Sequence, residues 1–81
     1  MPKVDISGLS YETKLIIAKD NCASADILAI LSEESNASIR EAVAANSNTL
    51  YEILANLAKD RWYCVRETVA ANPNYQQNKI S

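Results

Sequence analysis

The sequence predicts an all-α fold: a short right-handed α-solenoid of about 2.5 repeats, each 26 residues long with two helices, and about five short helices in all. One glycine and two prolines leave too few chain breaks for many short strands. Leu, Ile and Val supply the bulk among many alanines, without phenylalanine, which favours closely packed helices. The phrase "REAVAANSN" at 40–48 returns as "RETVAANPN" at 66–74, and this recurrence predicts the repeat.

The repeat extends beyond that phrase. Aligning 27–48 with 53–74 without a gap gives 11 identities in 22 positions. A degenerate earlier copy includes "KLIIAKDNC", where Lys14 matches Arg40 and Asp20 matches Asn46. Because 81 residues cannot enclose two cores, we expect a single domain over 1–81. Its copies are expected at about 10–35, 36–61 and, incomplete, 62–78.

The first helix of each repeat is predicted from the spacing of its apolar residues. Ile39, Ala42 and Val43 fall at i, i+3 and i+4, on one helical face. Asn36 precedes this helix as an N-cap, and Ser10 takes the same place in the first copy. We expect such helices over about 11–19, 37–45 and 63–71.

The turn after this helix carries Asp20, Asn46 or Asn72. Asparagine tolerates the left-handed backbone conformation that often closes a helix, and Pro73 strengthens the stop signal after Asn72. Since Asn46 and Asn72 fall on the apolar face, we expect their amides to be partly buried and bonded to backbone groups of the turn.

The second helix of each repeat is expected over about 24–32 and 50–58. Thr49 and Glu52 have the spacing of a capping box, and Ser24 starts the earlier copy. Helices this short are candidates for partial 3₁₀ geometry. After Tyr75 the polar stretch "QQNKIS" replaces the apolar helix, which predicts a polar or frayed end.

"VRETVAANPN" at 65–74 and the pattern T-x-x-E-I-L-x-x-L-A-x-D at 49–60 resemble the leucine-rich repeat variant family, related in shape to HEAT-type α-solenoids. The resemblance covers about 13–74 and implies a curved binding scaffold of alternating helices. Some family members carry a separate cysteine-rich cluster-binding segment, which is not found in this sequence, so the resemblance implies no iron–sulfur cluster. Trp62-Tyr63 and Leu50-Tyr51 stand where the family has prolines and other turn-forming residues.

Composition bounds the chemistry. There is no histidine, no glycine-rich phosphate loop and no metal-ligand spacing around Cys22 or Cys64, so we expect neither an enzyme nor a metal or cofactor site. The two cysteines are expected to be free thiols packed as small hydrophobes. The net charge of −2 and the mixed signs along the chain argue against nucleic-acid binding. The opening "MPKVDISG" and the lack of a long apolar run predict no signal peptide and no membrane span.

Exposed aromatic residues are the first candidate for a binding surface. Tyr11 and Tyr63 occupy the same repeat position, with Ala37 between them, and Trp62 precedes Tyr63 at the N-cap position. Tyr51 is a further candidate. Tryptophan and tyrosine are enriched at binding hot spots. The alternative is that these rings cover apolar residues at the open ends of the stack.

The second candidate is a row of bases, Lys14, Arg40 and Arg66, one per repeat. Gly8, Glu34 and Asp60 occupy another equivalent position, so Arg40 and Arg66 are expected to pair with Glu34 and Asp60 within or between repeats. Pairing of this kind would leave little for an anion-binding stripe.

We therefore expect a small non-catalytic, cytoplasmic protein-binding module that uses a solenoid surface with exposed aromatic residues to bind another protein. Three alternatives stay open. The first is a nucleic-acid-binding repeat, and the second is a structural repeat that forms a homodimer through the solenoid ends. The third is a small inhibitor of a larger complex, encoded by a phage or mobile element.

Overall fold

The computed structural model describes residues 6–77, and in this range all regular structure is helical, with no strand. Three nine-residue helices have the bounds expected for the first helix of each repeat. The two second helices are each one residue shorter at both ends than expected, and both are α-helices. The helices are α1 (Tyr11–Lys19), α2 (Ala25–Leu31), α3 (Ala37–Ala45), α4 (Tyr51–Leu57), α5 (Tyr63–Ala71) and α6 (Pro73–Gln77).

Side-chain caps start the first three helices. The Ser10 hydroxyl accepts a bond from Thr13 N at 3.2 Å, and the Ser24 hydroxyl accepts one from Ile27 N at 3.3 Å. Asn36 Oδ1 accepts a bond from Ser38 N at 2.8 Å. Each bond satisfies an amide that has no partner within the helix. The N-caps expected at Ser10 and Asn36 are confirmed.

The prediction of a capping box that starts at Thr49 is wrong. Leu50 is the N-cap of α4 and gives no side-chain cap bond, because the helix begins one residue later than the box requires. The buried Thr49 hydroxyl instead donates to Val43 O at 2.7 Å and ties the turn to the end of α3. Trp62 likewise gives α5 no side-chain cap bond.

The prediction that these turns close with a left-handed backbone conformation is also wrong. Asp20, Asn46 and Asn72 all have φ near −77° and ψ between 120° and 130°, which is extended backbone. No residue in the described range has a positive φ. The chain leaves each helix in an extended direction, because the side chains of these residues bond within the turns and remove the need for a left-handed closure.

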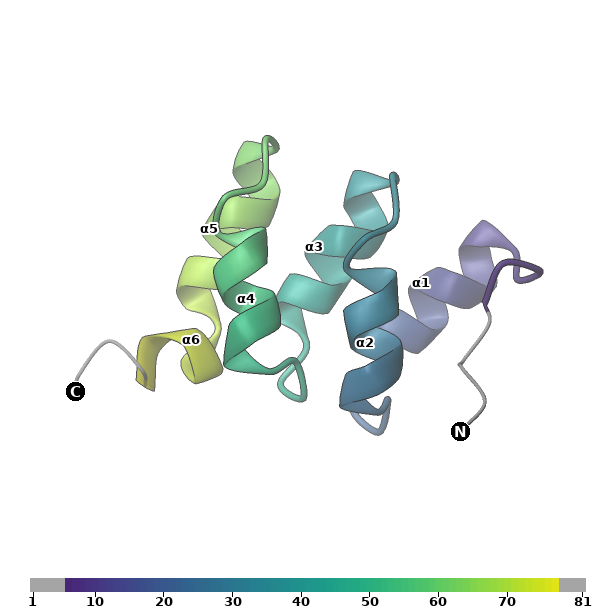
Figure 1. Cartoon of the computed structure of the whole chain (residues 1–81), viewed down its shortest axis with the longest axis horizontal. Coiled ribbons are helices and arrows are strands. Elements are labelled where there is room, and N and C mark those ends of the chain that lie inside the picture. The colour runs from purple at the N-terminus through teal and green to yellow at the C-terminus, as the bar shows by residue number, and fades with distance from the viewer. Residues whose placement is uncertain (1–5, 78–81) are drawn as a thin grey trace.

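The helices form two rows. α3 packs against α1 on one side and α5 on the other, so these three helices lie side by side in one row. In Figure 1, α2 and α4 lie in front of that row, each packed against the helices that precede and follow it in the chain. The loops that enter α3 and α5 lie at the top of this view, and the turns that leave α1 and α3 lie at the bottom.

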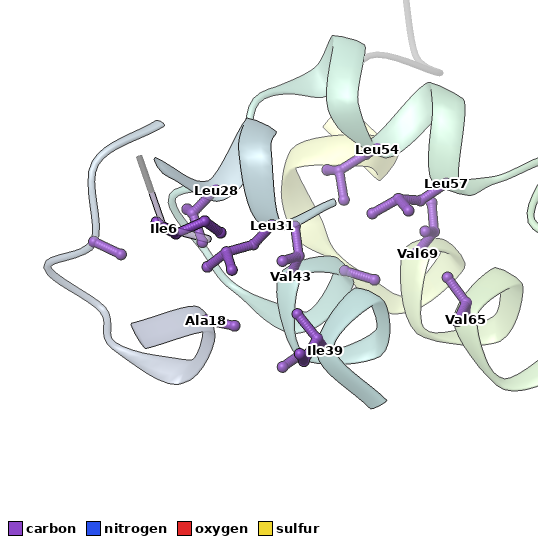
Figure 2. Packing of buried hydrophobic residues seen from close by; sticks show 13 residues of the cluster. Ile6, Ala18, Leu28, Leu31, Ile39, Val43, Leu54, Leu57, Val65 and Val69 are labelled. Atoms are coloured by element: carbon purple, nitrogen blue, oxygen red, sulfur yellow. The ribbon is translucent and has the colours of Figure 1, made fainter. Parts of the chain in front are cut away.

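The core lies between the two rows. Figure 2 shows branched side chains from both rows converging there, with Ile6 covering one end. Val43 and Val69, from the duplicated phrase, are fully buried. Small residues at the contacts, such as Ala18 and Ala44, allow neighbouring helices of the row to approach closely. The largest fully buried side chains are Leu28, Leu31, Ile39, Leu54, Val43, Val65, Val69 and Thr49.

The C-terminal segment differs from expectation, since α6 makes a sixth helix where a polar or frayed end was expected. Pro73 is preorganised for the first position of a helix, and Asn72 Oδ1 accepts a bond from Asn74 N at 2.8 Å. Tyr75 packs against the core, and its ring stacks on Tyr51 with centroids 5.5 Å apart. Residues 78–81 of the expected polar end lie outside the described residues.

Val43→Ala should lower the free energy of unfolding by about 1–3 kcal/mol, because it removes buried bulk from the middle of the core. Thermal or urea denaturation followed by circular dichroism measures the change. Ile16→Ala is the matched control: Ile16 lies on α1 with 68% of its surface exposed, and its truncation should change stability by less than about 0.5 kcal/mol. Equal effects of the two substitutions would contradict the core placement of Val43.

Candidate functional site

Two asparagines, Asn46 and Asn48, join the turn after α3 to the turn after α1. Asn46 Nδ2 donates to Ala18 O at 2.8 Å and to Asp20 O at 2.9 Å, while Asn46 Oδ1 accepts from Asn48 N at 2.8 Å. Asn48 Nδ2 donates to Asn21 O, and to Ala23 O at 3.1 Å. The Asn46 side chain therefore bonds only backbone groups, and it links the end of α1 and the turn that follows it to the turn after α3.

The same arrangement recurs one repeat later. Asn72 Nδ2 donates to Ala44 O at 2.8 Å and Asn46 O at 3.0 Å, and Asn74 Nδ2 donates to Ser47 O and Thr49 O. We call this set of bonds the amide ladder (Asn46, Asn48, Asn72 and Asn74). The expectation that Asn46 and Asn72 are at least partly buried and bonded to backbone is confirmed. Only Oδ1 bonds within the residue's own turn, however, while Nδ2 donates to the preceding turn.

The ladder is closed at both ends by different chemistry. Asp20 occupies the Asn46 position of the first turn, and its Oδ1 accepts from Cys22 N at 2.8 Å. A carboxylate has no N–H to donate, so Asp20 fixes its own turn and reaches no preceding one. At the other end, Gln76 Nε2 donates to Ala70 O at 2.7 Å, the carbonyl equivalent to those of Ala18 and Ala44.

Lys14 and Arg40 are each held by an acid in the loop that enters the next helix of the row. Arg40 Nε and Nη2 donate to the two carboxylate oxygens of Asp60 at 2.6 and 3.2 Å, and Arg40 Nη1 donates to Glu34 O at 2.8 Å. Lys14 Nζ lies 3.2 Å from Glu34 Oε1 in the same relation one repeat earlier. The pairing expected between Arg40 and Asp60 is confirmed, whereas Glu34 pairs with Lys14 and gives Arg40 only its backbone oxygen.

Arg66 is anchored but lacks a carboxylate. Its Nη1 donates to Asp60 O at 2.7 Å, which matches the bond from Arg40 to Glu34 O. Within residues 6–77 nothing accepts from Nε or Nη2 of Arg66. The expected pairing of Arg66 with Asp60 thus involves the Asp60 backbone, because the Asp60 side chain is taken by Arg40.

The candidate aromatic residues fall into two groups. Trp62 and Tyr63, at the start of α5, are 55% and 60% exposed and lie outside the buried cluster. The Tyr63 hydroxyl donates to Glu67 Oε2 at 2.6 Å, and this bond raises the pKa of the Tyr63 phenol. Tyr51 instead stacks on Tyr75, which covers the core beside α6. Tyr75, with Tyr51 stacked on it, thus covers an end of the core, whereas Trp62 and Tyr63 face solvent.

A hollow on the row of α1, α3 and α5 was not expected from the sequence. It has a volume of about 550 Å³ and an open mouth. The only signal in the sequence is the small residues that α3 presents there. The hollow is lined by Tyr11, Leu15 and Lys19 from α1, Glu41 and Ala42 from α3, and Thr68 from α5. Tyr11 therefore lies at the hollow and Tyr63 on the far outer helix, with α3 between them.

The cysteines are placed differently from expectation. Cys22 and Cys64 are free thiols, but both are exposed: Cys22 lies in the turn after α1, and Cys64 lies in the first turn of α5. Among the residues that the structure describes, no three side chains of the metal-binding types come together.

Comparison with protein-family models, with curated proteins and with solved structures finds no match for this chain. The resemblance to the leucine-rich repeat variant family therefore stays a prediction. None of the helices within residues 6–77 combines the length and apolar character needed to cross a bilayer.

Asn46→Asp should lower the free energy of unfolding at neutral pH by about 2–4 kcal/mol, because a buried carboxylate would face the Ala18 and Asp20 carbonyls that the amide now satisfies. Chemical denaturation measures the loss. Asn56→Asp makes the same chemical change at an exposed position of α4 and should cost less than about 0.5 kcal/mol. A small effect at both positions would show that the ladder contributes little to stability.

Asp60→Asn should destabilise the protein by about 1–3 kcal/mol at pH 7, because Arg40 would lose its carboxylate. The hydrogen bond from Arg40 holds the pKa of Asp60 below its ordinary value of 3.8. The stabilisation is therefore complete above pH 3.8 and is lost as the pH falls through the lowered folded-state pKa. Urea denaturation from pH 7 to pH 2 should show the difference between the native chain and the variant shrinking below about pH 4, whereas exposed Glu33→Gln should show almost no difference at pH 7.

Proposed function

We propose that the chain is a small, non-catalytic protein-binding module built as a short α-solenoid, and that the start of α5 is its main contact region. The observation that carries this proposal is the exposure of Trp62 and Tyr63, more than half of each residue, at a place where neither belongs to the buried core. Large aromatic rings bury much area at small cost in rotamer entropy, so they are frequent anchors of protein interfaces.

The α-solenoid description is supported by the repeated contacts. Each helix of the row α1, α3 and α5 follows its neighbour after 26 residues, and the amide ladder joins successive turns at the same spacing. Solenoids are held together by contacts of this kind between neighbouring units and present an extended row of helices as a binding surface. The hollow beside Tyr11 gives that surface a concave part.

The charges favour a protein partner over nucleic acid. Binding to a phosphate backbone needs bases that are free to release counterions. Lys14 and Arg40 are engaged by Glu34 and Asp60, and Glu41 lies in the hollow between the helices. The concave face therefore offers few free cations to a phosphate chain.

The closed ends of the ladder disfavour assembly of identical copies through the solenoid ends. If a second copy stacked in register beyond α5, its Asp20 would face the Ala70 and Asn72 carbonyls of the first copy. A carboxylate and a carbonyl are both acceptors, so no hydrogen bond could form between them. Gly8 occupies the position of Glu34 and Asp60 in the first repeat and carries no carboxylate for Arg66. Such a contact would therefore be poorly satisfied.

Trp62→Ala should weaken binding of the cognate partner by about 30-fold while lowering the melting temperature only slightly. Affinity purification with the intact chain as bait, followed by calorimetric titration of the identified partner, measures the first effect, and circular dichroism measures the second. Tyr51→Ala is the matched control: it breaks the stack on Tyr75, so it should lower the melting temperature and leave affinity nearly unchanged. A Trp62→Ala chain that melts earlier but binds its partner normally would assign Trp62 to end-capping.

A further inference from the structure

The repeat contains a template for what Arg66 binds. Arg40 uses Nη1 to hold Glu34 O in the loop that enters its own helix, α3, and this bond leaves Nε and Nη2 to bind the Asp60 carboxylate in the loop that enters α5. Arg66 makes the first of these contacts, to Asp60 O at 2.7 Å, and no described residue makes the second. Its guanidinium is therefore held in place, and its carboxylate-binding edge has no acceptor among residues 6–77.

The acid in this template has a fixed relation to a helix. Glu34 and Asp60 each stand two residues before the N-cap of the next helix, Asn36 and Trp62 respectively. The carboxylate that pairs with a base of the row is therefore followed directly by the helix that packs against the helix of that base. Side-chain pairing of this two-point kind is both stronger and more directional than a contact between point charges.

The helix face beside Arg66 is open in the same way. Ala18 and Ala44 are fully buried where the next helix of the row covers them, whereas the equivalent Ala70 is exposed. Trp62 and Tyr63 border this face at the start of α5. The outer face of α5 thus combines small residues that permit close approach, two exposed aromatic rings and an anchored guanidinium.

We propose that the outer face of α5 binds an acidic segment of another protein, in which an Asp or Glu two residues before a helix N-cap pairs with Nε and Nη2 of Arg66 and the helix packs along α5. This inference rests on the proposed function and names the chemistry of the partner. A second copy of this chain does not supply the segment in register, because Gly8 stands two residues before its first N-cap, Ser10.

The chain provides a defined probe for this site. An acetylated and amidated peptide of residues 34–45 carries the acid Glu34, the N-cap Asn36 and the helix of α3, and contains no aromatic residue. Trp62 is the sole tryptophan of the protein, so its fluorescence reports binding at the start of α5. Isolated helices of this length are marginal in water, so we expect weak binding, with a dissociation constant of roughly a few hundred micromolar.

Titration of the full chain with this peptide should change Trp62 fluorescence saturably, and the Glu34→Gln peptide should bind about tenfold more weakly. In Arg66→Gln protein the two peptides should bind equally. Arg61→Gln removes a neighbouring exposed arginine and should preserve the tenfold difference. Circular dichroism verifies that both variants are folded, and Arg66→Lys, which keeps the charge without the fork, should lose most of the discrimination.

Three results would overturn the inference: equal binding of the two peptides to the native chain, no saturable binding at millimolar peptide, or a difference that persists in Arg66→Gln protein. A fluorescence change on concentrating the protein alone would make a second copy the occupant and overturn it as well. If the affinity for a cognate partner depended on Trp62 and not on Arg66, the proposed function would stand, and the inference of an acidic segment would be rejected.

Discussion

The fold depends on a small number of side-chain amides that hold successive helix pairs in register across the core they share. Each helix pair is too short to enclose apolar residues alone, so successive pairs must be held in register. Asn46 and Asn72 do this by donating to two carbonyls of the preceding turn while accepting from an amide of their own turn. These bonds are made with almost no access to water, where an unmade bond is costly, so they specify position as well as adding stability.

The ion pairs follow the same plan on the other side of the row. Arg40 binds Glu34 O in the loop that enters α3 and the Asp60 carboxylate in the loop that enters α5, so a single side chain joins the two loops. The arginine and the asparagine of the duplicated phrase are therefore both contacts between repeats. The valine and alanines between them fill the core and set the helix spacing, which explains why the phrase recurs as a unit.

Sequence periodicity was enough to predict the bounds of α1, α3 and α5, because the buried positions repeat every 26 residues and Ser10 and Asn36 mark the start of the first two copies. The backbone of the turns could not be predicted in the same way. Asparagine favours both left-handed closure and side-chain bonding, and the choice depends on carbonyls that another turn supplies. The role of Gln76 depends likewise on the end of the stack, where its amide bonds the Ala70 carbonyl. Trp62 and Tyr63 were identified from composition and position alone, whereas the free edge of Arg66 became visible only beside the occupied edge of Arg40.

Asp20 has a consequence for how the protein behaves when it is concentrated. Head-to-tail contacts between identical units produce open filaments when the rotation between units does not close a ring. A chain assembled from near-identical repeats carries this risk at its two ends. The carboxylate of Asp20 differs from the Asn46 amide by one oxygen in place of a nitrogen, and this difference places repulsion where growth of a fibre would begin. A second copy that stacked in register would therefore meet an acceptor at the atom where Asn46 offers a donor.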